Sequence, residues 1–473
     1  MLYFMVDVTN TTQGEPLLMK NSKRATLRRY HSVPRLNFES HALTSFSGLV
    51  IIQKLFETTQ LKNHLRDCFR HLTVRPIFGH ARIMLLLIIH LMLGFRRIRD
   101  LKYYEHDPLV KRTLGLTRLP DVATISRSLA HADAKSVEYV QDFSRNHVIE
   151  QLKATCPARI TVDFDGSVIS TKRFAEQTAV GYNKKSKGCR SYYPLFSTIA
   201  QTGQVLDMLH RPGNVHDSNG ALGFVNHSLL ALSVQMPHTT LESRLDGAFY
   251  SHKMVDALSQ WGVQFSISVP FERLIALKEI VETRSRWKHI DSETSYFEPH
   301  WKPQSWDRAY RLIVVRSKKK FQSKEPVQLD MFVPHEYGYD FKVIVTNKTI
   351  KAKNVIAFHN GRGSQEGIFA ELKSQLNMDI IPFRRLIPNQ LYLMAGCIAH
   401  NFSRTLQMKV HPCRRTLSAK RTSLWAFQQI QTFRRNILNR AGKLTNPQRA
   451  LTLTISGNKT VEKEYADIMA ALG

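Results

Sequence analysis

Three acidic side chains lie at predicted strand or helix positions where a charged residue is unfavourable. Asp165 lies within the apolar, β-branched stretch ITVDFDGSVIS, and Asp246 follows SRL at the start of a predicted loop. Glu366 lies in FHNGRGSQEGIFAELK, a predicted helix. Carboxylates at strand ends are typical of divalent-metal sites, and two Mg²⁺ ions held between them can promote displacement at a phosphodiester. The pattern alone is not specific, because an Asp at a strand end is more often a turn former or a helix cap.

Glu366 shares one face of its predicted helix with two cations. At about 100° per residue, Glu366 falls about 40° and Lys373 about 20° from Arg362, whereas Glu371 falls about 180° away. Taken alone, this spacing indicates surface ion pairs worth a few tenths of a kcal/mol. Three glycines weaken the start of the helix, so Arg362 is expected on the entering turn rather than firmly on the shared face.

The charge of the chain indicates a polyanionic partner. The 473 residues include 67 Lys and Arg against 38 Asp and Glu, a formal net charge of +29. Such an excess implies nucleic acid most simply. From Ile380 to Val461 there are fourteen Lys and Arg and no acid, which predicts phosphate contact there. A basic loop between the first two predicted strands is either solvated or in contact with phosphate beside the acids, and we favour the second: Lys184, Lys185, Lys187 and Arg190.

The elements expected around the acids form an α/β fold in which helices cover a sheet. Alternation and β-branched residues predict an antiparallel meander of three strands, followed by helix, strand, helix and strand. These elements are expected at 159–170, 191–200, 203–212, 216–233, 239–248, 251–261 and 263–270. A basic, β-rich stretch follows at 271–349, and a long helix is expected at 389–408.

The region before the first strand is predicted to be mostly helical. Within it, PDVATISRSLAHAD predicts a short helix capped by Asp121 with Arg127 exposed, which could be half of a helix-turn-helix. The apolar run from Ile83 to Phe95 is too short to span a bilayer and predicts a buried core helix. The N-terminus lacks the pattern of a secretory signal, and the five cysteines form no CxxC pair. These features predict a cytoplasmic protein without a membrane partner.

Three segments together resemble the DDE transposases of bacterial insertion sequences. The tripeptide DGS that begins at Asp165 resembles the first-Asp motif of that family, and RLDGAFYS around Asp246 resembles the second. A third motif defines one branch of the family: Tyr, two residues, Arg, three residues, Glu, six residues, Lys. Its spacing is kept by His359, Arg362, Glu366 and Lys373, with His359 in the place of Tyr. The resemblance covers roughly 160–406, and more weakly the helical region from Leu43.

The resemblance implies an RNase H-like mixed sheet flanked by helices, with a helical N-terminal domain and a β-rich insertion. It implies that Asp165, Asp246 and Glu366 are the catalytic acids and ligate two Mg²⁺ ions, with Mn²⁺ as a substitute. Asp163, on the same face two residues before Asp165, is then either the ligand in place of Asp165 or a supporting partner, and we favour Asp165 because it heads DGS. The implied DNA-binding residues are Arg362 and Lys373 near the cut, with His359 still able to donate to phosphate.

The activity implied is binding of the terminal inverted repeats of an insertion sequence, metal-dependent strand cleavage, and strand transfer into new DNA. The partners would be double-stranded DNA of both ends and of the target, and a second copy of the chain on DNA, in the bacterial cytoplasm with the nucleoid. Two alternatives stay open: a nuclease of the same core that cuts without joining, and a DNA-binding protein that has lost catalysis. Trp301 and Trp306 are candidates to hold a flipped base, although an aromatic in a β domain is usually core.

The expected organisation has five parts in chain order. They are 1–155, a helical DNA-binding region that begins with a loose arm; 156–270, the first part of the catalytic core; 271–350, the β-rich insertion; 351–425, the second part of the core; and 426–473, a basic C-terminal region.

Overall fold

The computed structural model describes Val33, Leu36 and residues 42–155, 157–181, 183, 186–215, 219–319, 338–413 and 424–473. Lys184, Lys185 and nearly all of the expected N-terminal arm lie outside these residues. The chain divides into a unit of Met1–His41 and a unit of Ala42–Gly473. Every element named below belongs to the second unit.

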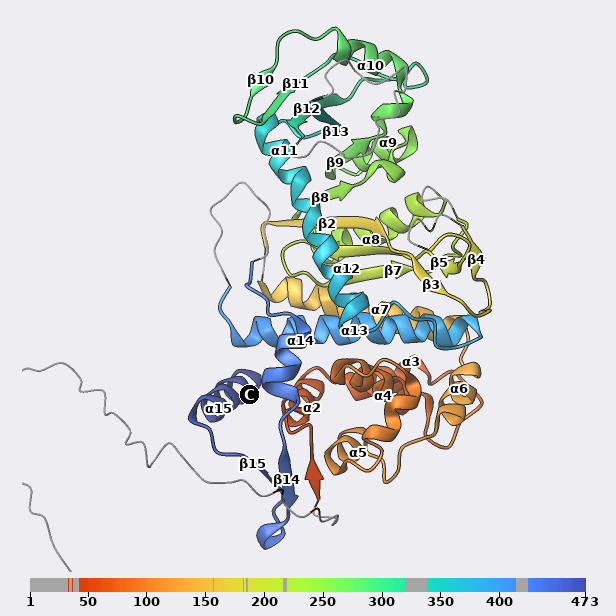
Figure 1. Cartoon of the computed structure of the whole chain (residues 1–473), viewed down its shortest axis with the longest axis vertical. Coiled ribbons are helices and arrows are strands. Elements are labelled where there is room, and N and C mark those ends of the chain that lie inside the picture. The colour runs from red at the N-terminus through yellow and green to blue at the C-terminus, as the bar shows by residue number, and fades with distance from the viewer. Residues whose placement is uncertain are drawn as a thin grey trace, which may run out of the picture. The chain divides into compact units, whose positions relative to one another are not determined.

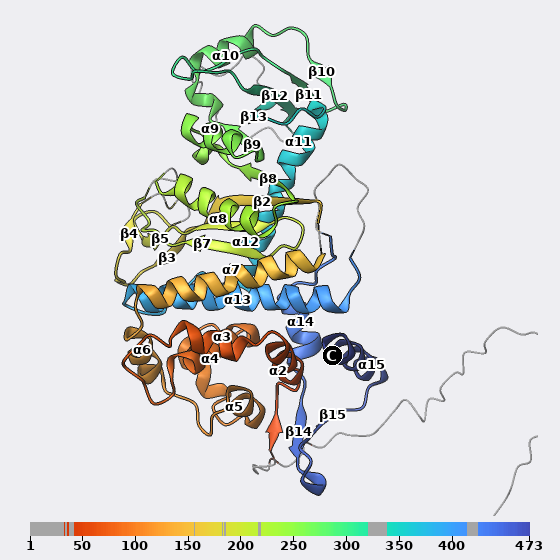
Figure 2. The same ribbon diagram turned by 180° about the vertical axis from the view of Figure 1, so that it is seen from behind.

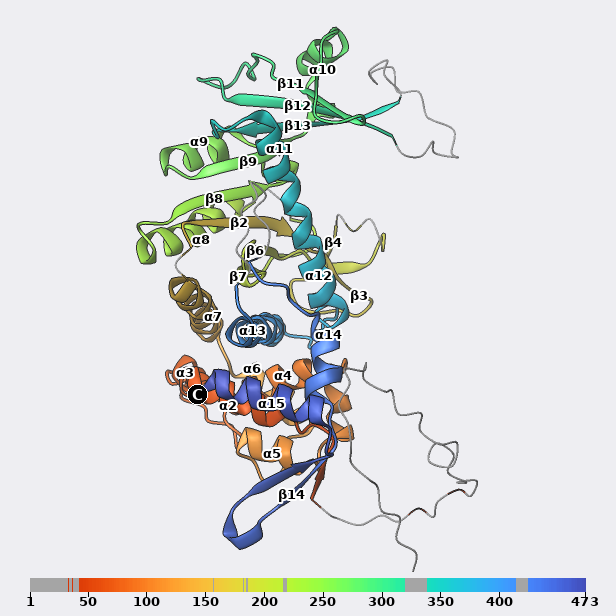
Figure 3. The ribbon, with the colours of Figure 1, turned by 90° about the vertical axis from the view of Figure 1, so that its left-hand side faces the viewer.

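A mixed sheet of nine strands forms the centre of this unit (Figures 1 and 3). Its spatial order is β10-β11-β12-β13-β9-β8-β2-β6-β7. The strands are β2 (Arg159–Gly166), β6 (Leu195–Ile199), β7 (Val205–Leu209), β8 (Thr240–Leu245), β9 (Gln264–Val269), β10 (Lys288–His289), β11 (Thr294–Phe297), β12 (Arg311–Lys318) and β13 (Tyr339–Thr346).

The five strands around β2 have the RNase H-like arrangement. β2 pairs antiparallel with β6, and β6 pairs antiparallel with β7, which is the predicted meander. On its other side β2 pairs parallel with β8, and β8 pairs parallel with β9. The predicted α/β fold class, with a mixed sheet flanked by helices, is therefore confirmed.

The β-rich stretch continues this sheet instead of forming a sheet of its own. β13 pairs antiparallel with β9, from Val343↔Val269 to Thr346↔Ser266. β12, β11 and β10 then follow outward, each antiparallel to its neighbour. The stretch also contains a short 3₁₀ turn, η3 (Phe271–Arg273), and a helix, α10 (Ile275–Glu282).

Helices pack on both faces of the sheet. On one face, α8 (Ala221–Gln235) and α9 (His252–Gln260) join a core that includes Phe164 and Leu245. The other face is crossed by α11 (Ala352–Asn360), the turn η4 (Gly361–Gly363) and α12 (Ser364–Ser374), which follow one another as a single rod in Figure 1. Side chains alternate along a strand. Phe164 points into the core on the first face, so Asp163 and Asp165, on either side of it in β2, point to this second face.

Two long helices, α7 (Ala134–Thr155) and α13 (Leu386–Val410), lie side by side next to the sheet (Figures 1 and 2). Both contact β7: Arg145 of α7 pairs with Asp207 at 2.6 Å, and Asn401 of α13 accepts from the Val205 N–H at 2.8 Å. The predicted long helix is thus present, and its buried face joins the sheet to the N-terminal helices.

The region before β2 is mostly helical, as predicted. Besides α7, its helices are α2 (Leu49–Thr58), α3 (Leu61–Cys68), α4 (His80–Leu93), η1 (Ile98–Tyr103), α5 (Pro108–Leu114) and α6 (Val122–Ala130). α4 is buried from Ile83 to Leu93, as predicted. Asp121 caps α6 by accepting from the Thr124 N–H at 2.6 Å, and Arg127 is exposed. Among the described residues, no helix combines the length and apolarity needed to cross a membrane.

Two smaller sheets were not predicted. β1 (Leu43–Thr44) pairs with β14 (Gly442–Thr445), which pairs with β15 (Thr452–Ile455), so the last part of the chain returns to the first. β3 (Ile169–Thr171), β4 (Ala179–Val180) and β5 (Arg190–Tyr192) form the other. The remaining C-terminal elements are α14 (Ile430–Phe433), η5 (Arg434–Leu438), η6 (Pro447–Arg449) and α15 (Lys459–Leu472).

Candidate active site

Asp165 and Asp246 lie next to each other at the carboxyl ends of two parallel strands. β2 and β8 are in register as far as Phe164↔Leu245, and each Asp is the residue that follows. Burial, and secondly the charge of Asp246, raises the pKa of Asp165 to about 6. Two close carboxylates resist sharing a site as anions unless a cation or a proton lies between them. The pair therefore creates a demand for positive charge.

Arg362 meets part of this demand. Its Nη1 donates to Oδ2 of Asp165 at 2.9 Å, and the two side chains are 23% and 21% exposed. Arg362 lies on the turn η4 between the two helices, as the glycines in this stretch indicated. Both acids also accept from nearby backbone: Asp165 from the Gly166 N–H and Asp246 from the Ala248 N–H, each at 2.8 Å.

Asp246 also caps the short turn η2 (Gly247–Phe249). The helix-cap interpretation left open by the sequence is thus correct for this residue, but it does not exclude a second role. One Oδ atom serves the cap, and a carboxylate has about four lone-pair sites in all.

Gly166, in the DGS motif, is explained by a close neighbour. A Cβ at this position would lie 2.5 Å from Cζ of the Tyr193 ring. A side chain there would require the Tyr193 ring to move, so glycine lets the ring pack against the end of β2 immediately beside Asp165.

Glu366 is not brought into the acid pair. It lies in the first turn of α12, one turn beyond Arg362, with its side chain exposed. Its neighbour Gln365 donates to the carbonyl of Asp163 at 3.1 Å, so this turn rests on β2. Among the described residues, no three His, Cys, Asp or Glu side chains form a cluster able to hold a metal. Two of the three predicted acids are therefore adjacent, and the third is on the turn next to them.

Asp163 has a different environment from Asp165. It is 1% exposed, and both of its oxygens accept from Arg244, at 2.5 Å from Nε and 2.6 Å from Nη2. Burial, only partly offset by Arg244, raises its pKa. Because its carboxylate is occupied by Arg244, Asp163 suits the supporting role, and Asp165 is the acid of β2 that faces Asp246.

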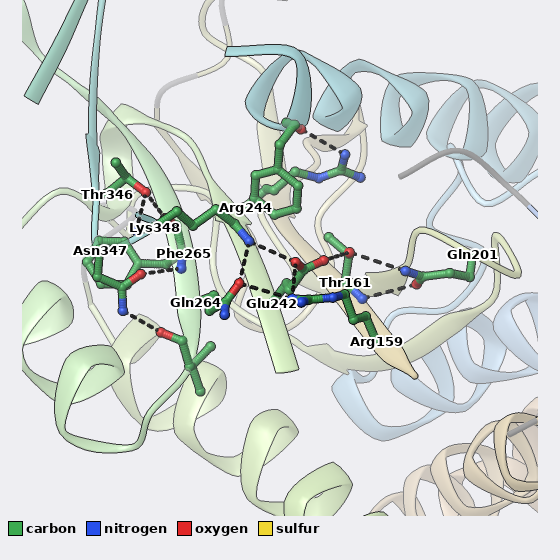
Figure 4. Close-up of polar contacts among 12 residues, drawn as sticks. Arg159, Thr161, Gln201, Glu242, Arg244, Gln264, Phe265, Thr346, Asn347 and Lys348 are labelled. Atoms are coloured by element: carbon green, nitrogen blue, oxygen red, sulfur yellow. Dashed lines mark hydrogen bonds and ion pairs between the residues drawn. The ribbon is translucent and has the colours of Figure 1, made fainter. Parts of the chain in front are cut away.

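A further buried polar layer lies below this ion pair on the same face of the two strands (Figure 4). Glu242 accepts from Thr161 Oγ1 at 2.8 Å and from Lys348 Nζ at 2.7 Å. Lys348 also donates to Gln264 Oε1 at 2.8 Å. Glu242 is 0% and Lys348 4% exposed. The polar face thus carries three layers at two-residue spacing, and only the last reaches solvent.

His359 is placed against expectation. It is 2% exposed on α11, between Ser268 Oγ at 2.9 Å from Nε2 and Ser266 Oγ at 3.0 Å from Nδ1. Burial, followed by the nearby cations Lys342, Arg362 and Arg244, lowers its pKa to about 3. The predicted donation from His359 to a DNA phosphate is contradicted, because both ring nitrogens are used inside the fold to hold α11 on β9.

Of the other predicted DNA-binding cations that the structure describes, two make contacts within the fold and one is exposed to solvent. Lys373 donates to the carbonyl of Val168 at 2.9 Å, which ties the end of α12 to the chain after β2. Arg190 donates to both oxygens of Thr178, with 3.0 Å to Oγ1. Lys187 is exposed. Any phosphate contact by these residues stays a prediction.

A hollow of about 730 Å³ adjoins Asp246, and sequence reasoning did not find it. η2, the end of β9 and β13 line it, with the cations Arg273 and Lys342 and the rings of Tyr250 and Phe341. Partial burial, and secondly Arg362, lowers the pKa of Lys342. Lys342 could not be identified beforehand, because the pairing of β13 with β9 brings it to the acids across a long gap in sequence.

A second hollow, of about 930 Å³, lies between α3 and α4 and is strongly basic. Its lining includes five cations and one acid: Lys62, Arg66, Arg70, Arg75, Arg82 and Asp67. No local pattern in the sequence indicates this hollow, because its cations are spread over two helices and the loop between them.

The two tryptophans of the β-rich stretch pack in or against the core. Trp306 is 6% exposed and stacks on Tyr250 with ring centroids 5.3 Å apart. Trp301 is partly buried against the same core. Both positions agree with the core alternative rather than with an aromatic held ready for a base.

The residues at the acid pair fit a divalent cation. Hard cations such as Mg²⁺ take carboxylate oxygens as ligands. Burial, and secondly the charge of Asp246, raises the pKa of Asp165 even though Arg362 pairs with it. A divalent ion would relieve the repulsion between Asp165 and Asp246 more completely than one guanidinium does.

Comparison with known proteins identifies the family. No curated protein matches the chain. Among solved structures, the chain is similar to a piggyBac transposase synaptic complex with hairpin DNA, with TM-score 0.44, 12% identity, and coverage of 91% of this chain and 88% of that one. A second, weaker similarity is to a Mos1 transposase paired-end complex with the left transposon end. Its TM-score is 0.18 and its identity 10%, and it covers 38% of this chain and 57% of that one. The family described as transposase DDE domain group 1 matches residues 28–473. Since that match spans nearly the whole length, the chain belongs to the transposase DDE domain family.

Proposed function

We propose that the protein binds the ends of a mobile DNA element, cleaves a strand there and joins it to new DNA, with Asp165, Asp246 and Glu366 as the catalytic, metal-binding acids. The observation that carries the proposal is the pair of carboxylates at the ends of β2 and β8, where burial, and secondly the charge of Asp246, raises the pKa of Asp165. Membership of the transposase DDE domain family supports the same chemistry.

Asp165 and Asp246 would hold the divalent ions, Mg²⁺ or Mn²⁺, with Glu366 as the third ligand. When bound, such ions activate the attacking water or 3′-hydroxyl and stabilise the leaving oxygen in phosphodiester displacement. The chain's own residues supply the position: β2 and β8 fix the two aspartates, and the turn of α12 that rests on β2 carries Glu366.

Arg362 has two tasks in this proposal. It pairs with Asp165, and it binds a phosphate oxygen of the DNA beside the acids. A guanidinium carries five N–H donors, so both contacts can be made at once. Lys342 and Arg273, in the hollow beside Asp246, would hold the backbone further along the same strand.

The basic hollow between α3 and α4 is proposed to contact the DNA end away from the cut. Its lining has five cations and one acid: Lys62, Arg66, Arg70, Arg75, Arg82 and Asp67. Contacts of this kind are made to phosphates and release counterions, so binding should weaken steeply with salt. The proposed setting is the bacterial cytoplasm, with a second copy of the chain on the DNA so that two ends are joined together.

The test is an assay with purified protein, Mg²⁺ and DNA that carries the inverted repeats flanking this reading frame. We expect nicked ends and joined products with the wild type, and neither with Asp246→Asn. Cutting without any joined product would favour a nuclease of the same core. DNA binding with no cutting by the wild type would favour a protein that has lost catalysis.

A further inference from the structure

One buried guanidinium touches the chain segments that carry the proposed catalytic acids. Arg244 lies on β8, two residues before Asp246. It holds both oxygens of Asp163, which is two residues before Asp165 on β2. Its Nη1 donates to the carbonyl of Phe358 on α11 at 3.0 Å. A single side chain thus joins β8, β2 and the rod of α11 and α12, and Figure 4 shows it reaching toward the helix.

Burial makes this junction rigid. Arg244 is 0% and Asp163 1% exposed, and the guanidinium also lies over the ring of Phe358, 5.4 Å from its centroid. A buried charge of this kind cannot reorient without leaving an unpaired group in the interior. The relative positions of the three segments are therefore set by the donors of Arg244, close below the acids.

Gly361 provides a second, independent observation. A Cβ at this position would lie 2.1 Å from Nη1 of Arg244, so that either η4 or the guanidinium held by Asp163 would have to shift. The backbone of Gly361 is ordinary for a helix, with φ −59° and ψ −16°, so the conformation does not demand glycine. What demands it is the close approach of η4 to the guanidinium. Gly363 and Gly367, in the same rod, have open space where a Cβ would be.

We propose that Arg244 is a positioning residue for the active site. Gly361 has no side chain, and this allows η4 to pack directly against the guanidinium of Arg244. Through Asp163 and the Phe358 carbonyl, Arg244 sets the spacing between Asp165, Asp246 and the turn that carries Arg362 and Glu366. This inference rests on the proposed function, because it assigns Arg244 a task at that site.

The first experiment compares Gly361→Ala with Gly363→Ala, a matched control two residues along the rod. Gly361→Ala should push η4 and α12 away from the strand ends. We expect its affinity for Mn²⁺, followed by electron paramagnetic resonance, to fall about 10- to 100-fold, as for supporting residues of metal sites. A displacement of about 1 Å should slow cleavage about 100-fold. DNA affinity should change far less, because it depends on many phosphate contacts besides that of Arg362. Gly363→Ala should match the wild type in all three measurements.

The second experiment removes the ion pair without leaving a buried charge. Asp163→Leu combined with Arg244→Met replaces the pair by apolar side chains, an exchange that folded proteins often tolerate. We expect a folded protein with weakened Mn²⁺ binding and slowed cleavage. The matched control is Glu242→Leu with Lys348→Met, which removes a pair of similar burial one layer further from the acids. The control should keep its Mn²⁺ affinity.

Two results would overturn the positioning role. One is equal Mn²⁺ affinity and cleavage in Gly361→Ala and Gly363→Ala; the other is an equal loss in the two pair replacements. If Mn²⁺ binding by the wild type does not depend on Asp165, the proposed metal site fails instead. In that case amide hydrogen exchange over residues 352–374 tests the positioning role separately. If Gly361→Ala leaves this exchange unchanged, the positioning role of Arg244 is overturned as well.

Discussion

Two aspartates on one face of β2 are two residues apart, yet their surroundings differ in kind. Asp163 is 1% exposed and accepts from two nitrogens of Arg244. Asp165 is 21% exposed, accepts from one nitrogen of Arg362, and faces a second acid, Asp246. The difference arises on β8, where the residue opposite is Arg in one layer and Asp in the next. Residue type and strand do not decide whether an acid is structural; the neighbouring strand does.

The difference in charge balance has a functional meaning. In the inner layer an arginine compensates the aspartate, and the result is a fixed junction between chain segments. In the outer layer the partly exposed Arg362 pairs with Asp165, which also faces Asp246, and the result is a place that a cation would stabilise. The two layers should therefore respond differently when their charged residues are replaced.

The largest difference is expected in activity. Asp165→Asn and Asp246→Asn should each reduce strand cleavage at least about 1,000-fold, a loss of about 4 kcal/mol of transition-state stabilisation. Binding of end DNA should persist, because it depends on phosphate contacts. Gel assays of cleavage and of DNA retention measure the two. Glu366→Gln sharpens the comparison: if it cleaves at the wild-type rate, the exposed Glu366 is not the third acid.

The next difference is expected in stability. Arg244→Ala leaves Asp163 buried without its partner and should cost about 3–5 kcal/mol of unfolding free energy. Arg362→Ala breaks a partly exposed pair and should cost about 0–1 kcal/mol. Urea unfolding of both variants at neutral pH makes the measurement. Equal costs would mean that the two layers are not different in kind.

A smaller change in the free energy of unfolding, this time an increase, is expected when the charge of Asp165 is removed. The folded-state pKa of Asp165 is raised to about 6 from 3.8, so the folded state favours the protonated form. Its contribution to stability is complete at low pH and is lost as the pH rises through 6. Without metal, Asp165→Asn should therefore be more stable than the wild type at pH 8, by about 1–3 kcal/mol.

The pH dependence provides the control for that prediction. The advantage of Asp165→Asn should vanish toward pH 4, where the wild-type carboxyl is itself protonated. Asp163→Asn should instead destabilise the protein at pH 8, because it leaves Arg244 buried with its charge uncompensated. Urea unfolding across this pH range follows both variants, and a stabilising Asp163→Asn would contradict the assignment of the layers.

The smallest effect is expected at an exposed cation. Lys187→Ala should change the free energy of unfolding by at most about 0.5 kcal/mol. If Lys187 contacts phosphate, the variant should lower the slope of log affinity against log salt by about 1. Titration of end DNA at several salt concentrations measures this, and an unchanged slope would assign Lys187 to solvent.

Much of this fold could be predicted from local patterns, and the parts that could not depend on pairing. The strands with Asp165 and Asp246 alternate clearly and were found near their true ends. The pairing of β13 with β9 was not predictable, because nothing in either strand names its partner, and Lys342 reaches the site only through it. β1 has two residues, too few for a periodic signal.

The candidate site shows the same limit. Motif spacing found Asp165, Asp246 and Arg362, which the structure brings together. The same spacing also indicated His359 as a DNA contact. Two serines of β9, which no motif spacing could reveal, hold His359 inside the fold instead. The role of Arg244 was missed because it depends on a contact with the Phe358 carbonyl, far away in the sequence.

The central claim is that Asp165 and Asp246, with Glu366 on the adjoining turn, form one divalent-metal site. The most direct measurement replaces the native ion by Fe²⁺ and maps where hydroxyl radicals produced at the bound iron cut the protein backbone. The account predicts cuts clustered near residues 165, 246 and 366, all of them lost in Asp165→Asn and kept in Gly363→Ala. Cuts elsewhere in the chain, or cuts at these positions that persist in Asp165→Asn, would contradict it.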